Sequence, residues 1–377
     1  MTPERRVLIY SQRGLSRHVS RCPGYEFEDL VAAELETADI LAPTASRASP
    51  LLLKARGQVA RRSRLYRALP TGLGLSGLGE GYDLLFAYVG LPRDLATLDA
   101  FDLRRRAGRA VVWLQELAAA DVPGYGPGLD VLNTFDHVIC GLAGTVPALA
   151  ARLDVPVHYA CWGLDALAFC PWPDPPERVI EFYNLSNVSQ ATHAALLAHA
   201  KASGAFYDFP TEIGIHTARD ASEHRWRYAD RLKRSRYFYA GTARVRSRAE
   251  GGWKRAAAQA EFGSRYVEAL AAGAILLGDR VPTPEFEASL GWEDAVIPVP
   301  YECPGIVDIM AGLDADPARL AAARRRNVTQ VLARHDCLHR WEQVLDLVGL
   351  PPTPGMARRR EALAARAALV AAAPEEG

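Results

Sequence analysis

The stretch that decides the fold runs from Glu261 to Gly278 and reads Glu-Phe-Gly-Ser-Arg-Tyr-Val-Glu-Ala-Leu-Ala-Ala-Gly-Ala-Ile-Leu-Leu-Gly. Gly263 and Ser264 predict a turn followed by an N-cap, and the apolar residues after them recur with the spacing of one helix face. Gly273 predicts the end of that helix, just before a short apolar strand. We therefore expect a loop, a helix and a buried strand in succession.

Such a helix start is a natural site for an anion. Its first backbone N–H groups have no partner within the helix, so they attract phosphate, and Gly263 lets the anion approach closely. Glu268 lies one turn further in, where it would face sugar hydroxyls. Arg265 is the first candidate to neutralise such a phosphate, followed by Arg244 and Lys254 in the preceding loop. The helix start is thus predicted to bind a phosphate group.

Each of these residues also has a purely structural interpretation. The basic residues before the helix would equally form a solvated face, as most charge runs do. Acidic residues at a helix start complement the helix dipole without binding any ligand, which applies to Glu261 and Glu268. Their context along the chain therefore has to decide between the two interpretations.

The first half of the chain alternates short apolar runs with amphipathic segments. The runs are residues 7–10, 84–89, 110–114, 137–140 and 155–160. Runs of this kind, bounded by Gly, Asp and Pro, predict buried parallel strands joined by helices. Four prolines between residues 162 and 176 interrupt the pattern and predict a domain boundary near residue 175.

A second alternation follows the boundary. Strands are predicted at residues 179–183, 236–239, 274–277 and 296–299, and helices at 190–202, 266–272, 317–333 and 338–348. We therefore expect an α/β protein with two Rossmann-like domains that face each other across a cleft, residues 1–175 and 176–350. A helical tail, residues 351–377, would pack back on the first domain.

The acids and the turn between them resemble the signature of retaining GT-B glycosyltransferases of the group-1 type. In that family the first Glu holds hydroxyls of the donor sugar, the Gly turn lies against the sugar and the second Glu grips the ribose. The resemblance implies that Glu261 acts on the sugar and that Gly263, Ser264 and Glu268 bind the donor. The family usually places seven residues between the two acids, and this chain has six.

Two further passages extend the resemblance to roughly residues 156–350. Residues 157–171 are similar to the strand, Gly, Asp and Phe-x-Pro passage that leaves the first domain, although Trp162 replaces the usual Asn. Residues 334–345 resemble the ending of a bacterial subset related to spore-maturation glycosyltransferases. The family implies transfer of a hexose from a nucleoside diphosphate to an acceptor hydroxyl with retention of configuration.

The composition of the chain limits which partners, location and cofactors we expect. The formal net charge is zero, with 44 Lys plus Arg and 44 Asp plus Glu, which predicts no nucleic-acid partner. No apolar run approaches the roughly 20 residues of a membrane span. The six cysteines are scattered without a Cys-x-x-Cys pair, so we expect reduced thiols in a cytoplasmic protein. No Asp-x-Asp pair precedes the predicted donor site, so neither a metal nor a cofactor is predicted.

Alternatives remain at this level. A nucleotide-sugar epimerase or hydrolase would share the donor site, and a non-catalytic GT-B subunit would share the fold. The sequence assigns no general base, His18 included, and identifies neither the base, the sugar nor the acceptor. Acceptor choice is expected in the first-domain loops at residues 12–25 and 44–81.

Overall fold

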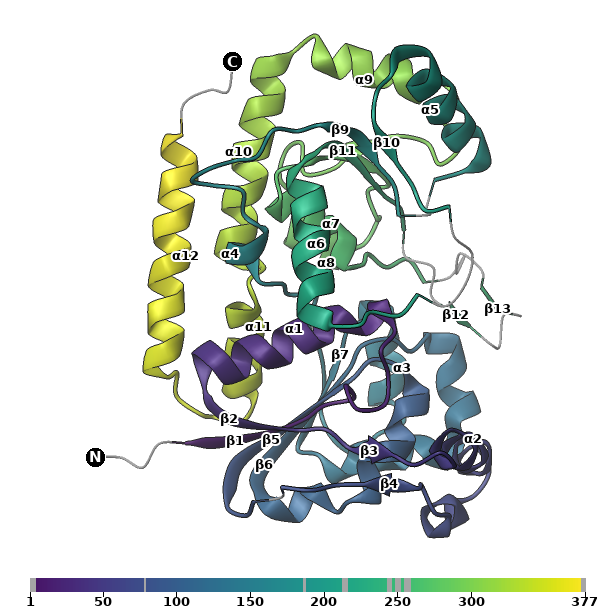
Figure 1. Ribbon diagram of the computed structural model, residues 1–377. Helices are drawn as coiled ribbons and strands as arrows, with labels where there is room; N and C mark the ends of the chain where they lie inside the picture. Colours follow the sequence, from purple (N-terminus) through teal and green to yellow (C-terminus); the bar gives the residue numbers. More distant parts are fainter. Residues whose placement is uncertain are drawn as a thin grey trace.

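The computed structural model describes residues 5–77, 79–185, 188–211, 216–242, 246–247, 252–253 and 259–373. Two parallel sheets, one in each half of the chain, form the centres of two α/β layers stacked one above the other (Figure 1). The first sheet has the order β2-β1-β5-β6-β7-β8. Its strands are β1 (Arg6–Tyr10), β2 (Thr37–Leu41), β5 (Tyr82–Val89), β6 (Ala107–Leu114), β7 (His137–Cys140) and β8 (Val157–Tyr159).

The second sheet repeats this winding with the order β10-β9-β11-β14-β15. Its strands are β9 (Ile180–Tyr183), β10 (Tyr207–Asp208), β11 (Ser235–Ala240), β14 (Ile275–Gly278) and β15 (Ile297–Pro298). In both sheets the second strand lies outside the first, so the strand order reverses between the first and third strands. Ligands of doubly wound sheets bind at the carboxyl ends of the strands beside this reversal.

Helices cover both sheets. The α-helices are α1 (Cys22–Leu30), α2 (Ser49–Ala60), α3 (Val146–Ala150), α4 (Ala166–Phe169), α5 (Gln190–Ser203), α6 (Ala221–Lys233), α7 (Ser264–Ala271), α8 (Pro284–Leu290), α9 (Ile306–Asp314), α10 (Pro317–Arg334), α11 (Cys337–Leu347) and α12 (Pro354–Ala372). The 3-10 segments are η1 (Val19–Arg21), η3 (Arg64–Ala68), η4 (Pro92–Ala100), η5 (Leu103–Arg106), η6 (Ala119–Thr134) and η7 (Ala143–Thr145), and η2 (Val31–Leu35) is a π-helical continuation of α1. Two short antiparallel pairs join β3 (Thr44–Ala45) to β4 (Leu73–Gly74) and β12 (Arg246–Ser247) to β13 (Gly252–Trp253).

The C-terminal helices bind the two halves together. Trp341 of α11 is fully buried, and its ring contacts Phe86 of the first sheet at a centroid distance of 5.4 Å. Arg359 of α12 forms ion pairs with Glu34 at 2.6 Å and with Asp336 at 2.7 Å. In Figure 1, α12 runs along one side of the upper half, and its lower end reaches the level of α1 and α11, just above the first sheet. The prediction that the tail packs back on the first domain is therefore confirmed.

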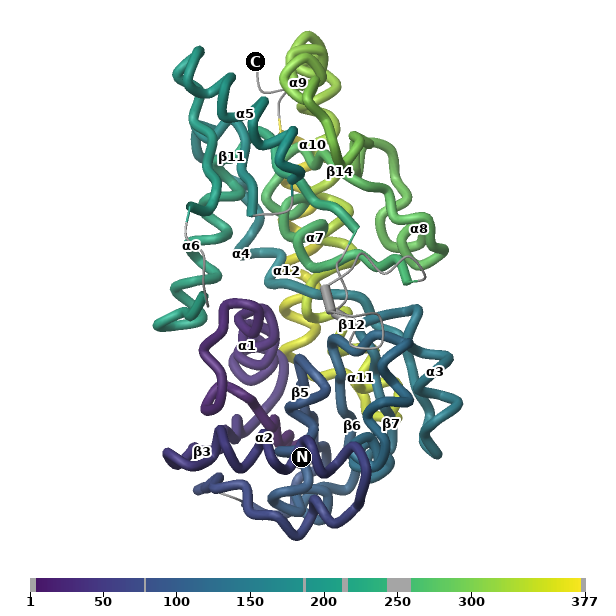
Figure 2. The backbone as a smooth tube through the Cα atoms, turned by 90° about the vertical axis from the view of Figure 1, so that its right-hand side faces the viewer, coloured from purple at the N-terminus to yellow at the C-terminus, as the bar shows by residue number. Residues whose placement is uncertain are grey.

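α1 and α6 meet where the two halves face each other. Figures 1 and 2 both show α1, from the first half, below α6 from the second. The contact places the loop after β1 beside the start of α6, and Val19 N donates to His216 O at 3.0 Å. The two walls of any cavity between the halves are thus fixed relative to each other.

The α/β class with two doubly wound sheets agrees with the sequence prediction, while the division at residue 175 stays a prediction. None of the described helices combines the length and apolarity needed to cross a membrane. All six cysteines are buried and free.

Candidate active site

The predicted loop, helix and strand are present as the segment that leads into α7 and β14. Gly263 is the N-cap of α7, and no side chain bonds to the first N–H groups of the helix. A Cβ added at Gly263 would meet no atom within 4 Å, so the space beside it is open. The sequence predicts Ser264 as the cap; instead it is the first helical residue, and its hydroxyl donates to Glu268 at 3.1 Å. The helix start therefore presents uncapped amides to open space.

That space is a cavity of about 1060 Å³ between the two halves of the molecule. From the second half it is lined by the loops that follow β9, β10 and β11 and by the starts of α6 and α7. From the first half it is lined by residues that follow β1, β6 and β8. The cavity thus lies at the carboxyl ends of both sheets, and on the second sheet it spans the β9–β11 reversal of strand order.

Glu268 lines this cavity but is held tightly by its neighbours. Its side chain is 2% exposed, and Oε1 accepts from Arg225 Nη1 at 2.5 Å. The same guanidinium binds Glu26 of α1 at 3.0 Å and lies over the ring of Phe169 at 4.8 Å. Burial disfavours the charge on Arg225, but the two carboxylates outweigh that effect and raise its pKa. A buried Glu26–Arg225–Glu268 triad therefore joins the donor helix to the first half.

Glu261 faces the first half instead of the cavity. Its carboxylate accepts from Gly144 N at 2.8 Å and Ala143 N at 3.3 Å, at the start of η7, and from Gln259 Nε2 at 2.9 Å. Burial raises its pKa, and these hydrogen bonds oppose the shift. The residue is 4% exposed and is not part of the cavity lining. Its oxygens are satisfied by protein, and the predicted role toward the donor sugar stays a prediction.

Arginines supply the positive charge of the second-half wall. Arg265 lines the cavity at the start of α7, and Nη1 donates to Leu185 O at 3.2 Å. Arg219, which precedes α6, and Arg227, on α6, also line it. Among the described residues, none of the three arginines has a carboxylate partner. Two further predicted donor residues, Arg244 and Lys254, lie outside the described part of the chain.

The first-half wall has a different character. His18, Val19 and Ser20 line it from the segment after β1, and Pro23 lines it from the start of α1. Glu116 lines it from just after β6, and Trp162 from the segment after β8. Burial, with smaller contributions from Arg21 and other nearby cations, lowers the pKa of His18, so this imidazole is neutral at pH 7. Among described residues, the predicted acceptor loop at 44–81 contributes nothing to the lining.

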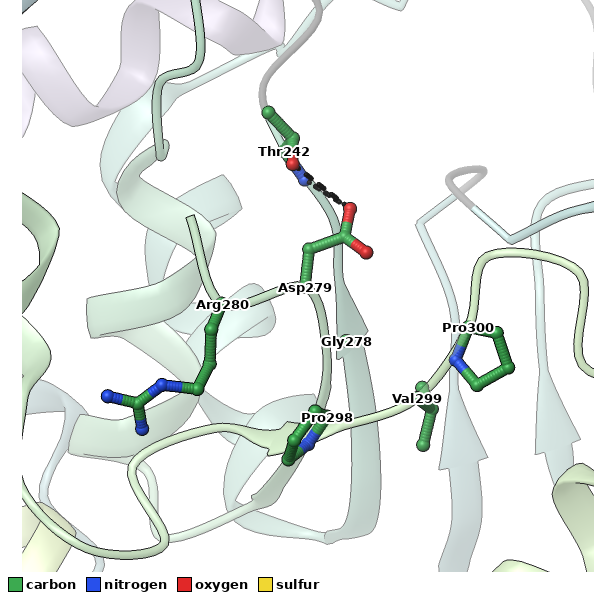
Figure 3. Close-up of a pocket in the computed structure, with 7 residues that line it drawn as sticks. All are labelled: Thr242, Gly278, Asp279, Arg280, Pro298, Val299 and Pro300. Carbon is green, nitrogen blue, oxygen red and sulfur yellow. Dashed lines mark hydrogen bonds between the residues drawn. The ribbon is translucent and has the colours of Figure 1, made fainter. Parts of the chain in front are cut away.

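A smaller hollow of about 580 Å³ lies beside the main cavity, at the ends of β11, β14 and β15. Figure 3 shows Asp279 pointing toward Thr242, whose N–H and hydroxyl both donate to Oδ2 at 3.0 Å. Arg280 extends away from this pair and binds Glu287 at 2.9 Å. Thr242 lines both hollows, so the two are neighbours along the edge of the second sheet.

Comparison with protein families decides the assignment. The model of a family described as glycosyl transferase-like matches residues 145–346, more than half of the chain. The chain belongs to this family. The matched region of the glycosyltransferase contains the second sheet, the triad residues Arg225 and Glu268, and the whole of α7. No curated protein matches the chain.

Solved structures agree on the GT-B fold. An α-glucosyltransferase in complex with UDP and a 13-mer DNA has 13% identity and a TM-score of 0.53, over 92% of this chain and 100% of its own. Anabaena HepE in complex with UDP-glucose has 14% identity and a TM-score of 0.50, over 91% of this chain and 99% of its own. Identities this low establish the fold of the glycosyltransferase alone. One of these structures holds DNA. The comparisons therefore do not support the prediction, made from the net charge, that the protein has no nucleic-acid partner.

Sequence reasoning missed the contribution of α6. Arg225 and Arg227 lie on that helix, which the sequence analysis did not predict; its N-cap is Asp220, whose side chain accepts from Glu223 N at 3.0 Å. It also missed Glu116, which follows an apolar strand as an ordinary polar residue. A polar residue two positions after a predicted parallel strand was the available indication, since such strand ends meet at one edge.

Proposed function

We propose that this glycosyltransferase transfers a hexose from a UDP-sugar to an acceptor hydroxyl, with retention of configuration and without a metal ion. The observation that carries the proposal is the uncapped start of α7 beside Glu268, which opens into the cavity at the strand-order reversal. UDP is proposed because the structures of similar fold hold UDP or UDP-glucose.

Charge on the second-half wall supports a metal-independent reaction. Negative charge accumulates on the diphosphate as its bond to the sugar breaks, and cations placed there stabilise the transition state. Arg265, Arg219 and Arg227 line the cavity and have no carboxylate partner within the described residues. No carboxylate thus competes with phosphate oxygens for these guanidinium groups among the described residues.

The chemical step we propose follows from the family resemblance. The acceptor oxygen bonds to the anomeric carbon while the bond from that carbon to the diphosphate oxygen breaks on the same face. The proton of the acceptor hydroxyl moves to the departing phosphate, and UDP leaves. The residues of the chain would hold the donor, exclude water and stabilise the diphosphate, so no enzymic nucleophile is required. The six free, buried cysteines support a cytoplasmic location for this reaction.

Calorimetric titration with UDP-glucose tests the donor site, with GDP-, dTDP- and ADP-glucose for comparison. Glu268→Ala should weaken UDP-glucose binding roughly 100-fold, because charge-assisted hydrogen bonds to the ribose are lost. Glu26→Ala is the matched control: it also removes one carboxylate from Arg225, but Glu26 does not line the cavity. Its affinity should stay within about threefold of the unaltered protein. Equal weakening in both variants, or no binding of any donor, would contradict the proposal.

Product analysis tests the remaining parts. Nuclear magnetic resonance of the transferred sugar should show the anomeric configuration of the donor, and turnover should persist in EDTA. Incubation with UDP-glucose alone distinguishes the rivals, since an epimerase would change the sugar without any acceptor. A product with inverted anomeric configuration would contradict retention. Loss of turnover in EDTA would contradict metal independence.

A further inference from the structure

Glu116 occupies an unusual position on the first-half wall. It follows β6, and its N–H donates to Gly90 O at 3.2 Å, which fixes the backbone at the edge of the sheet. The flanking residues Gln115 and Leu117 are buried, whereas the Glu116 side chain is accessible and lines the cavity. Its carboxylate has no hydrogen-bond or ion-pair partner among the described residues. An acceptor group without a partner therefore projects into the space opposite the predicted donor site.

Electrostatics oppose a purely structural role for this carboxylate. Surrounding protein atoms raise the pKa of Glu116 by desolvation, and Arg21 opposes the shift. Arg21 is itself paired with Asp94 at 2.5 Å, so it does not neutralise Glu116 directly. Glu116 is the charged side chain that the first half gives to the described lining, since His18 is neutral at pH 7. A diphosphate or any other anion would be repelled from this wall.

Trp162 lines the same cavity from the segment after β8. The indole is half-buried, and within the described residues it has neither a hydrogen bond nor an aromatic partner. It also stands where the resembled passage usually has Asn, so this chain differs here from the family. β7 separates β6 from β8, which puts the two strand ends roughly 10 Å apart at the usual spacing of strands.

A carboxylate and a flat indole together suit one kind of ligand. The face of an indole packs against the C–H surface of a ring, and its N–H and the carboxylate bond to hydroxyls at the ring edge. We propose that Glu116 and Trp162 form the acceptor subsite and that it takes a neutral or cationic polyhydroxyl compound, that is, a carbohydrate without phosphate or carboxylate. This inference rests on the proposed glycosyltransferase reaction and names its acceptor class.

The same argument separates this chain from the relative whose structure holds DNA. Binding of a nucleic-acid backbone depends on cations that neutralise phosphates. The arginines of the cavity come from the second half, where the donor diphosphate would occupy them, and the first half presents Glu116. DNA should therefore be a poor acceptor for this enzyme.

The test measures UDP release from UDP-glucose with five added acceptors: glucose, maltose, glucosamine, glucose 6-phosphate and a 13-mer DNA duplex. Glu116→Gln, Glu116→Lys, Trp162→Ala and Trp162→Phe are compared with the unaltered protein. Trp226→Ala is the matched control, since this indole is 72% exposed on α6 and does not line the cavity. Thermal unfolding checks that each variant is folded, and UDP titration measures the donor site independently.

At least one of the three sugars without phosphate should stimulate UDP release, and glucose 6-phosphate and DNA should not. Glu116→Gln and Trp162→Ala should lower acceptor kcat/KM roughly tenfold or more, with UDP affinity unchanged. Trp162→Phe should retain most activity, and Glu116→Lys should favour glucose 6-phosphate over glucosamine. Stimulation by DNA or glucose 6-phosphate alone, or by none of the five, would overturn the proposal, as would unchanged kcat/KM in both single variants. If the unaltered protein did not bind UDP, the result would instead contradict the assignment of the donor site.

Discussion

The two walls of the cavity differ in charge. The second-half wall carries Arg219, Arg227 and Arg265 together with the uncapped start of α7. The first-half wall carries a neutral imidazole and the unpartnered carboxylate of Glu116. The difference indicates a division of labour in which one wall binds an anionic donor and the other receives an uncharged acceptor.

The buried triad joins these walls, and its removal should produce the largest effect. Arg225→Met leaves Glu26 and Glu268 as buried carboxylates without a counter-charge, which should lower the free energy of unfolding by about 3–5 kcal/mol. Urea denaturation measures the change. Arg227→Met is the matched control, because Arg227 is exposed on the same helix and should cost less than about 0.5 kcal/mol. Equal stability of the two variants would show that the triad does not hold the walls together.

Charge on the second-half wall can be tested next. Arg265→Ala and Arg227→Ala should each weaken UDP binding roughly tenfold, because each removes a charge-assisted hydrogen bond to phosphate. The loss should diminish for uridine, which has no phosphate. Arg358→Ala, an exposed arginine of α12 outside the cavity, serves as the control in the same calorimetric titration. A loss as large with uridine as with UDP would place the diphosphate elsewhere.

Glu261 connects the two halves and does not line the cavity, so its substitution should change stability and leave ligand binding unchanged. Glu261→Gln keeps one carbonyl oxygen for the amides of Ala143 and Gly144 but loses the charge, so stability should fall by about 1 kcal/mol. Affinity for UDP should not change, because Glu261 does not line the cavity. Thermal unfolding and UDP titration together give the answer. Unaltered stability with weaker UDP binding would mean that the carboxylate turns toward the donor.

The smallest effect concerns Glu116 and pH. Desolvation raises the pKa of this carboxyl in the folded protein, so the unfolded chain loses its proton first as pH rises. The resulting destabilisation is absent at pH 3.5 and develops above the ordinary value of 4.5. Glu116→Gln should therefore be more stable than the unaltered protein at pH 7, on the order of 0.5 kcal/mol for an accessible side chain, and equal to it at pH 3.5. A gain that is the same at both pH values would refute the assigned shift.

The second-half wall was the part that sequence reasoning could predict. The strand and helix pattern gave both sheets because buried parallel strands are continuous apolar runs. It missed β2 and β10, since β2 is an edge strand with polar residues and β10 has only two residues. α7 was predicted because its turn and its apolar stripe are local features of the sequence.

The contacts that connect the two walls could not be predicted from the sequence. Glu268 was expected to face a ligand, but nothing local indicates that Arg225 binds it or that Glu26, far along the chain, completes the triad. Glu261 likewise meets Gly144 only through the packing of one half on the other. Such contacts depend on how distant segments pack together, and no local sequence pattern indicates that packing.

A crystal structure of the protein with UDP tests the central claim most directly. We predict the diphosphate within hydrogen-bond distance of the backbone N–H groups of Ser264 and Arg265, with the ribose beside Glu268. A UDP molecule bound elsewhere, for example in the smaller hollow beside Asp279, would contradict the assignment of the second-half wall as the donor site.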